Sequence, residues 1–473
     1  LMADHFPNQS PAQWADRLLA SADNDIGFDH VEKVIFGNGV EHGYSAEAGH
    51  GILDVYAALQ PILSNSYTAS ISAGNSFLGG EGSYAFNETA ISSAISFGDS
   101  INNAFEGEFT YMYDALDGGF AFNMGQKIIP PMSVVKPSIS IDYEIGEIKL
   151  LKYKKLSFTN SFSENKNRSR YLTITESEGN SSLIGFTSNA SWNGYNDASY
   201  VFPFLADIQG GTGINFGNDL GNGYLTLSYN IEGQDGQNAI SAKDALTFGY
   251  KISPIENVNI SYLLGFADEN ESFLGVKGTG AFDFDGADNK TTFFGLKSDI
   301  KLSNKQFINF GFGLSDTVIN KNNEGIIQSV SGLIADSFEI GFTTFNIFGS
   351  DMTSFSISQP SRVSSGSAEL RIAGLAEADG SIPYKYKNIS MEPSGRQLDF
   401  AITYNYDLND FSSLRIKMLM TDEKGHAADV DREESVFIGY SRSSLSGNQK
   451  FEIGATSSSS NETALKVNYN LTW

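Results

Sequence analysis

The sequence predicts a mainly β protein, a closed antiparallel transmembrane β-barrel with a small α-helical region at the N-terminus. Three observations predict this fold class. Apolar and polar residues alternate along many segments, as in strands with one apolar face. The connections between these segments are short and long in turn, and no apolar run reaches the roughly 18 residues of a transmembrane helix. Counting back from the C-terminus gives about 12 strands, and strand-like segments upstream allow an even total of about 14–16.

The final segment shows the alternation most clearly. Every second residue from 465 to the end is apolar, in the order Leu465, Val467, Tyr469, Leu471 and Trp473. A strand that crosses a membrane with a tilt of about 45° needs roughly 9–11 residues, which this segment supplies. These five side chains are therefore expected to face lipid. The aromatic ending also resembles the C-terminal signature of outer-membrane barrels, which implies that the five residues form the insertion signal.

The same period of two residues recurs upstream, at 225–231, 246–252, 258–266, 308–314, 398–406, 414–420, 436–440 and 451–455. Short turns such as SNK and DLND alternate with long polar connections, for example residues 267–290 and 315–336. Unequal rims are typical of outer-membrane barrels, in which closure leaves no unpaired strand edge in lipid. A soluble all-β protein is the alternative, but it would need a second sheet to cover residues such as Phe310 and Phe312.

The composition restricts the classes of partner. The chain has 31 basic and 56 acidic residues and a net charge of −25, which argues against nucleic acid because phosphate binding requires basic patches. The absence of cysteine excludes disulfides and thiolate metal sites. The sequence has no phosphate-binding loop, nucleophile elbow or zinc-ligand spacing, so no cofactor is expected. The chain opens on Leu and without a signal peptide, so we expect it to begin inside a longer protein.

Residues 1–63 differ in character from the rest of the chain. Ser10, Pro11 and Gln13 form a helix-start signal, with Ser10 as N-cap and Gln13 as its capping-box partner. A second short helix is expected around residues 52–59. The segments LMADHFPNQSPAQ, WADRLLASA and GHGILDVYAAL resemble, in order and spacing, the C-terminal end of the subtilisin-like serine peptidases. This resemblance implies that residues 1–63 are the remnant of a subtilisin-like α/β peptidase domain; an unrelated pair of helices is the alternative.

A second resemblance extends into the predicted barrel. The segments SFSISQPSRVSSGSAELRI, MEPSGRQLDFAITYNY and DEKGHAADVD resemble the subtilisin-like autotransporters, in which one chain carries a peptidase and its own translocating barrel. Residues 127–222 show little of this resemblance. It implies three parts, namely the end of the peptidase domain at 1–63, a linker at 64–117 and an outer-membrane autotransporter-type barrel at 118–473.

The resemblance also implies a function. The chain would translocate and anchor a self-secreted subtilisin-like serine endopeptidase in the outer membrane of a Gram-negative bacterium, with the passenger at the cell surface or released. The implied partners are outer-membrane lipid, the barrel-assembly machinery, the chain's own passenger and the protein substrates of the peptidase. The residues themselves leave another function open, that of a porin-like channel or surface-binding barrel with a non-catalytic N-terminal plug.

No residue of this chain is expected to be catalytic. A subtilisin-like site needs a Ser nucleophile, a His base and an Asp that orients the His, and the resemblance places all three before residue 1. The five histidines, none of which stands in a matching motif, are His5, His30, His42, His50 and His426. His426 is expected to be solvated in its polar loop.

Two further segments carry predictions. In DFDGAD, Asp283, Asp285 and Asp288 are close enough together to be calcium ligands, but a solvated acidic loop is favoured because the full calcium loop of about 12 residues is missing. Residues 97–114 are predicted to form a helix, in which Ile101, Phe105 and Phe109 recur every four residues. The autotransporter resemblance implies that this helix threads the barrel lumen and plugs it; the alternative is an ordinary linker helix.

Overall fold

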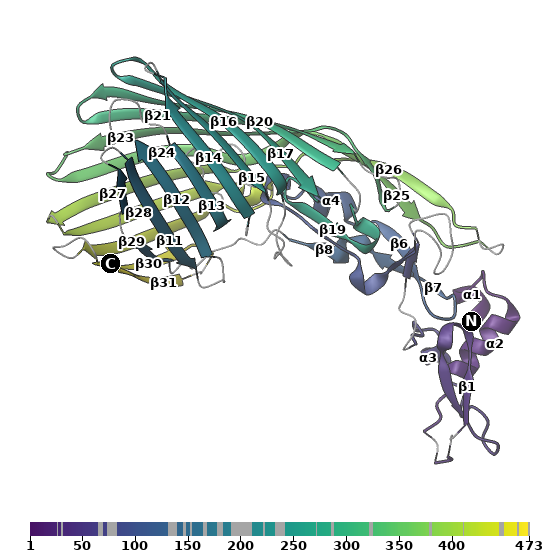
Figure 1. The fold of residues 1–473 in the computed structure, drawn as a ribbon. Coiled ribbons are helices and arrows are strands. Elements are labelled where there is room, and N and C mark those ends of the chain that lie inside the picture. The colour runs from purple at the N-terminus through teal and green to yellow at the C-terminus, as the bar shows by residue number, and fades with distance from the viewer. Residues whose placement is uncertain are drawn as a thin grey trace.

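The computed structural model describes residues 1–25, 27–29, 32–64, 70–72, 83–130, 140–144, 148–151, 154–163, 168–176, 183–190, 211–220, 223–231, 242–270, 272–284, 288–320, 325–377, 381–409, 411–443, 449–460 and 463–471. Between residues 140 and 190, and after Leu465, it describes the backbone alone. Figure 1 shows a large barrel of tilted strands with smaller elements at one end and the N-terminal elements beyond them.

Most of the described chain forms one 18-stranded sheet. Neighbouring strands pair antiparallel from β11 to β31. β9 lies beside β31 and also pairs with β11, so strands from the two ends of the sheet meet at β9. The spatial order is β10 (Ile148–Leu151), β11 (Lys154–Ser163), β12 (Arg168–Glu176), β13 (Leu183–Ala190), β14 (Gly211–Asp219), β15 (Gly223–Ile231), β16 (Ala242–Ile255), β17 (Val258–Asn270), β20 (Asp288–Ser303), β21 (Gln306–Asn320), β23 (Leu333–Phe345), β24 (Asp351–Ser365), β27 (Leu398–Asn409), β28 (Ser412–Asp422), β29 (Glu433–Ser443), β30 (Gln449–Ser458), β31 (Thr463–Leu471) and β9 (Ser140–Glu144).

The predicted fold class, a mainly β antiparallel barrel, is confirmed, but the strand number of about 12, with a total of about 14–16 allowed, was too low. The additional strands lie upstream of β15. In β13 (LIGFTSNA) and β14 (GTGINFGND), Ser, Thr, Asn and Gly occupy many positions. Because few of these residues are large and apolar, the period of two is weak in the sequence, although the backbone ladder still forms.

The two faces of the sheet differ as the alternation predicts. Most inward positions hold small or polar residues, and several of these, such as Ala267, Thr291 and Ser315, are buried. Large apolar side chains on the outward face stay exposed, among them Leu264, Phe266, Ile340, Ile357, Ile402, Met418, Val436, Ile438 and Ile453. An exposed apolar band around a sheet of this size is the surface that lipid covers.

The predicted insertion signal is only partly covered by the structure. Leu465 lies in β31 and is 71% exposed, as expected of a lipid-facing residue. Val467, Tyr469 and Leu471 belong to the same strand, but only their backbone is described. Trp473 lies outside the described residues. The role of these five residues in insertion therefore stays a prediction.

The two ends of the barrel are unequal. At one end, residues 256–257 join β16 to β17 and residues 304–305 join β20 to β21. At the other end, residues 271–287 separate β17 from β20 and residues 366–397 separate β24 from β27. We call these the short-turn end and the long-loop end. The order of the strands directs β31 toward the short-turn end.

The long-loop end carries smaller elements (Figure 1). We call residues 83–130, which supply many of them, the mouth segment. The small sheets at this end are β18 (Ser272–Phe273), β19 (Val276–Thr279), β5 (Ala90–Ser92) and β8 (Ile128–Ile129); β4 (Ser83–Ala85), β3 (Ser70–Ser72), β6 (Phe109–Tyr113) and β7 (Gly119–Asn123); and β22 (Ile327–Val330), β25 (Ser367–Ala373) and β26 (Tyr384–Ser390). The short helices are α4 (Ser100–Phe105) and the 3-10 turns η2 (Phe86–Glu88), η3 (Ile95–Phe97), η4 (Met124–Lys127), η6 (Gly280–Phe282) and η7 (Lys424–His426).

Residues 1–64 form the N-terminal unit, with α1 (Met2–His5), α2 (Pro11–Ala20), β1 (Glu32–Ile35), η1 (Gly37–Gly39), β2 (Glu41–Tyr44) and α3 (Val55–Ala58). The predicted capping box is confirmed, because Ser10 Oγ accepts a bond from Gln13 N and Gln13 Oε1 accepts one from Ser10 N. The second helix is shorter than predicted, and Ile52 and Tyr56 are exposed. No helix in the described ranges is long and apolar enough to cross a membrane.

Candidate functional site

The predicted helix at residues 97–114 is wrong. The structure divides this stretch into the end of η3, the six-residue helix α4 and the strand β6. Gly98 (φ 49°) and Gly107 (φ 69°) interrupt it, because this backbone conformation cannot continue a right-handed helix. Ile101 and Phe105 are buried on α4, whereas Phe109, on β6, is 55% exposed. The three residues therefore do not form one helical face.

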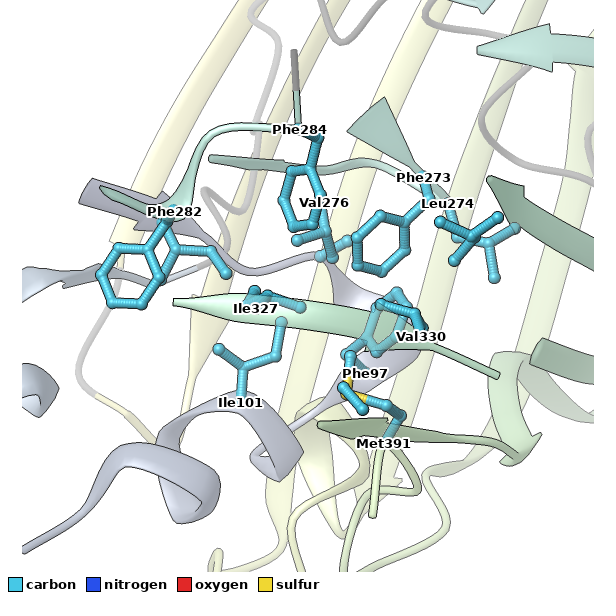
Figure 2. Packing of buried hydrophobic residues seen from close by; sticks show 14 of the residues in the cluster. Phe97, Ile101, Phe273, Leu274, Val276, Phe282, Phe284, Ile327, Val330 and Met391 are labelled. Atoms are coloured by element: carbon cyan, nitrogen blue, oxygen red, sulfur yellow. The ribbon is translucent and has the colours of Figure 1, made fainter. Parts of the chain in front are cut away.

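Aromatic side chains of the mouth segment pack against the long loop between β17 and β20. Phe97 meets Phe273 at a ring-centroid distance of 5.8 Å, and Phe105 meets Phe282 at 5.1 Å. Figure 2 shows Phe97, Phe273 and Phe282 gathered with Val276, Phe284 and Ile327 into one packed group. Phe105 belongs to the same buried cluster. The same buried cluster contains the inward-facing barrel residues Leu263, Ala267 and Phe293. The mouth segment thus lies over the long-loop end of the lumen.

The long loop that receives the mouth segment was predicted to be polar, and this expectation is wrong. Phe273, Leu274, Val276, Phe282 and Phe284 are all fully buried. The sequence does contain a signal for this packing, since SFLGV and AFDF bring large apolar residues into a loop with many glycines and acidic residues. Such residues cost free energy when left in water, so they indicate a folded loop.

Backbone pairing fixes the mouth segment to the same loop. β5 pairs antiparallel with β19 and parallel with β8. Ser92 Oγ donates to Lys277 O at 3.0 Å and accepts a bond from Lys277 N at 3.1 Å. Thr279 Oγ1 donates to Glu88 O at 2.6 Å. The mouth segment is therefore part of a hydrogen-bonded sheet with the barrel's own loop, and does not merely rest on it.

A second group of contacts attaches α4 to the loops after β26 and β28. The Asp99 carboxylate accepts hydrogen bonds from Ser394 N, at 2.8 Å, and from Ser394 Oγ. Burial alone would raise the pKa of Asp99, but the bonds from Ser394 are among those that lower it below its usual value. The backbone of Gly98 lies so close to Gly425 that a Cβ atom at residue 98 would overlap it.

His426 is fully buried in this region, so the expectation of a solvated histidine is wrong. Its Nδ1 accepts a hydrogen bond from Gln397 N at 2.9 Å, which leaves the proton on Nε2, and Nε2 lies 3.2 Å from Ser361 O. The neutral ring thereby joins the loop after β26 to β24. Burial, followed by the nearby guanidinium groups of Arg362 and Arg396, lowers the pKa of His426 to about 4.

We expect the loops around His426, which pack against the mouth segment, to lose stability in mild acid. The folded-state pKa of His426 is about 4, whereas its ordinary value is 6.5, so between these values the unfolded state binds the proton and the folded state does not. Stability is fully present above pH about 6.5 and falls by up to about 3 kcal/mol as the pH drops to about 4. Near-UV circular dichroism on heating, at pH 7 and at pH 5, measures this loss. His426→Asn, which tolerates the positive φ of 58°, should show a weaker pH dependence.

The other predicted site residues lie apart from the mouth contacts. Asp283 follows η6, Asp285 lies outside the described residues, and Asp288 begins β20 with its side chain not described. The calcium prediction therefore stays untested. Within the described ranges no three His, Cys, Asp or Glu side chains are placed to hold a metal ion. His42 and His50 lie together in the N-terminal unit, with their Nδ1 atoms 3.3 Å apart, His5 is exposed on α1, and His30 lies outside the described residues.

The lumen is polar toward the short-turn end. A cavity of about 870 Å³ lies among β27, β28, β29 and β30. Ser413, Arg415, Ser441 and Glu452 are among its lining residues. Arg415 Nε donates to Asn405 Oδ1 across the β27–β28 ladder at 2.8 Å. The lumen is thus polar near the short turns and apolar beneath the mouth segment.

The sheet, its outward apolar band and its unequal ends define an outer-membrane β-barrel protein. No family model and no curated protein matches the chain. Among solved structures it is similar to OmpT, an outer membrane protein of Vibrio cholerae, with 9% identity over 67% of this chain and 94% of that one at a TM-score of 0.38. It is also similar to OccK11 (OpdR) of Pseudomonas aeruginosa, with 12% identity over 69% and 86% of the two chains at a TM-score of 0.40.

Proposed function

We propose that this chain is a surface anchor, an outer-membrane barrel that holds its N-terminal unit outside the cell and fills its own outer mouth with residues 83–130. The observation that carries the proposal is the position of both parts at the long-loop end of the barrel (Figure 1). The long loops of outer-membrane barrels face the outside of the cell, whereas the short turns face the periplasm.

The direction of the first strand supports the same arrangement. β9 pairs antiparallel with β11, and the antiparallel order continues through β12, β13, β14 and β15 to β16. β9 therefore runs in the same direction as β16, which ends at the short turn of residues 256–257. The chain enters the barrel at the long-loop end. Because the chain enters there, the mouth segment (residues 83–130) does not have to run through the lumen of the finished barrel.

The finer proposal concerns what is anchored. We propose that the N-terminal unit closes a subtilisin-like serine endopeptidase, and that this chain is the translocator and anchor of that self-secreted enzyme. The resemblance of residues 1–63 supports this, as does the capping box at Ser10. The barrel-assembly machinery, outer-membrane lipid, the passenger and its protein substrates are the partners proposed with it. A fluorophosphonate probe applied to cells that express the complete gene tests the enzyme. If no polypeptide were labelled, the proposal of a peptidase would be contradicted, whereas the proposal of a surface anchor would still stand.

A second candidate function is a channel, which the polar cavity near Arg415 and Glu452 favours. A conductance measurement separates the two functions, because an anchor with a filled mouth should conduct little. We expect low conductance for the unaltered chain in planar bilayers and a severalfold rise for the double variant Phe97→Ala/Phe105→Ala. This variant removes both aromatic contacts with the loop between β17 and β20.

The matched control is Phe109→Ala, which truncates an exposed ring of the same segment. It should leave the conductance unchanged. A large, steady conductance of the unaltered chain would contradict the anchor and favour the channel.

A further inference from the structure

The N-terminal unit does not complete its own apolar core. The buried cluster of this unit contains Val40, Ala115 and Leu116, with Ala20, Phe36 and Ile62 packed against it. Ala115 and Leu116 belong to the hairpin tip, which we define as residues 114–118 between β6 and β7. Ala115 has no exposed surface and Leu116 is only 6% exposed. Two of the three buried members thus come from a hairpin more than 50 residues further along the chain.

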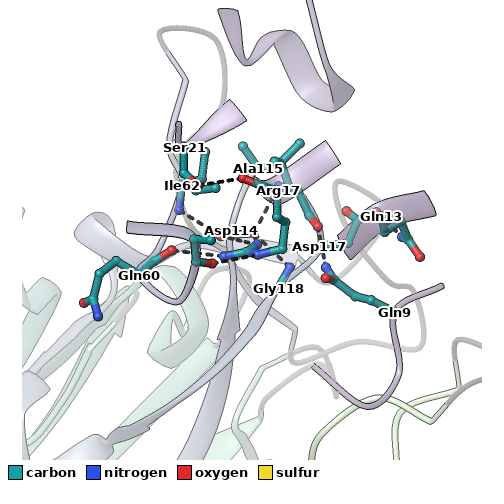
Figure 3. A network of polar contacts seen from close by, with 12 residues as sticks. Gln9, Gln13, Arg17, Ser21, Gln60, Ile62, Asp114, Ala115, Asp117 and Gly118 are labelled. Carbon is teal, nitrogen blue, oxygen red and sulfur yellow. Dashed lines mark hydrogen bonds and ion pairs between the residues drawn. The ribbon is translucent and has the colours of Figure 1, made fainter. Parts of the chain in front are cut away.

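A buried ion pair also joins the unit to the hairpin tip. Arg17 Nη1 donates to both carboxylate oxygens of Asp114, at 2.8 and 3.0 Å, and neither side chain is exposed. The same carboxylate accepts bonds from the backbone N–H groups of Ile62, Leu116 and Gly118. Arg17 also donates to Ala58 O at 3.2 Å and to Gln60 O at 3.0 Å. Figure 3 shows Asp114 at the centre of this network.

The backbone of the hairpin tip fits the unit closely. Gln9 Nε2 donates to Leu116 O at 2.6 Å, Asn38 Nδ2 donates to Ala115 O at 2.8 Å, and Ala115 N donates to Ile62 O at 2.9 Å. A Cβ atom at Gly118 would overlap the Arg17 guanidinium, so a larger residue at this position would displace Arg17. The contact therefore combines apolar burial, a buried ion pair and backbone hydrogen bonds, which is the composition of a domain core and not of a loose tether.

We infer that the hairpin tip is an integral part of the N-terminal unit, which therefore stays bound at the barrel mouth after the chain is cut between the two. The partner that the N-terminal unit recognises is a tight turn of this chain with an aspartate, two apolar residues and a glycine. The inference rests on the proposed function only for the side of the membrane on which the unit is held. Cleavage after residue 64 converts a covalent attachment into a non-covalent one and does not release the unit.

The test uses the complete chain, purified in detergent, with a site-specific protease sequence inserted after Ser64 and an affinity tag before Leu1. After complete cleavage, checked on a denaturing gel, size-exclusion chromatography separates the free fragment from the fragment that travels with the barrel. We expect the fragment to remain with the barrel at low and at high salt, because the ion pair is buried and poorly screened. Asp114→Ala should increase the released fraction at least about tenfold, because Arg17 then stays buried without its charge partner.

Glu108→Gln is the matched control. It alters a carboxylate just before β6, at the end of that strand away from the hairpin tip, that pairs with Lys387 at 2.7 Å. This variant should retain the fragment. Arg17→Lys is a milder variant, included in case Asp114→Ala fails to fold. Lys keeps the positive charge but cannot bond to Asp114, Ala58 and Gln60 together, so this variant should release an intermediate fraction of the fragment.

Release of the unaltered fragment as fast as the Asp114→Ala fragment would overturn the inference. So would equal retention of all four proteins. Because the measurement is made in detergent, its result does not depend on where the barrel is located in the cell. A barrel that failed to reach the outer membrane would therefore overturn the proposed function and leave this result standing.

Discussion

Loss of the Asp114 carboxylate is expected to destabilise the N-terminal unit by about 3–5 kcal/mol, the usual cost of breaking a buried ion pair on one side. Asp114→Leu leaves Arg17 charged in a site with no solvent access, and it leaves the N–H groups of Ile62, Leu116 and Gly118 without their acceptor. Hydrogen exchange of the α2 amides, followed by mass spectrometry, measures the loss as a fall in the free energy of opening.

The double variant Arg17→Met/Asp114→Leu separates charge from hydrogen bonding. Removing both charges should recover part of the stability lost in Asp114→Leu, because no unpaired guanidinium then remains buried. Recovery should be incomplete, since the three backbone N–H groups still lack an acceptor. If the stability lost in the double variant equalled or exceeded the sum of the losses in Arg17→Met and Asp114→Leu, the two charges would not stabilise each other, and the assignment of Asp114 as the partner of Arg17 would fail.

Arginine on the outward face of the barrel should be nearly as harmful. Ile357 lies near the middle of β24, is 42% exposed and has Ile340 and Phe400 as its cross-strand neighbours. Ile357→Arg is expected to cost about 2–4 kcal/mol, as for a basic residue near the bilayer midplane. Urea titration of folding into lipid vesicles gives the free energy, and the heat-dependent mobility shift on gels gives the folded fraction.

The adjacent residue provides the comparison. Ser356 points to the opposite face, between Gly341 and Ala401, so there is space for a longer side chain toward the lumen. Ser356→Arg should therefore cost much less than Ile357→Arg. Equal losses for the two variants would mean that the faces of β24 are wrongly assigned, and with them the lipid-facing band.

The barrel could be predicted from the sequence because a membrane strand repeats its pattern every two residues and needs no distant information. Ile402 and Met418 illustrate this, since each lies on the outward face that its place in the alternation indicates. The strands upstream of β15 were harder to count because small polar residues obscure the period. The long-loop end could not be predicted in this way. Phe105 and Phe282 are 177 positions apart in the sequence, and neither residue indicates the other before the chain has folded.

The error at residues 97–114 has a specific physical origin. The four-residue spacing of Ile101, Phe105 and Phe109 favours a helix, but Gly98 and Gly107 adopt positive φ values and end it on both sides. Phe109 then alternates with Thr110 in a strand. The same limit applies to His426, whose polar neighbours indicate a solvated loop, while its burial comes from β24 and the loop after β26. The spacing of apolar and polar residues along the chain indicates neither the positive φ values of the two glycines nor the distant elements that bury His426.

The wide sequence separation of the mouth contacts sets an order of events during assembly. Ser92 bonds to a residue 185 positions later, and Asp99 to one 295 positions later. Contacts this distant form late, because the intervening chain must first be brought together. Most of the strands have to be in place before residues 83–130 find their partners. Before these contacts form, we expect the strands of the barrel to be paired while the long-loop end of the lumen is still open, so that closure of this end is among the last steps of assembly.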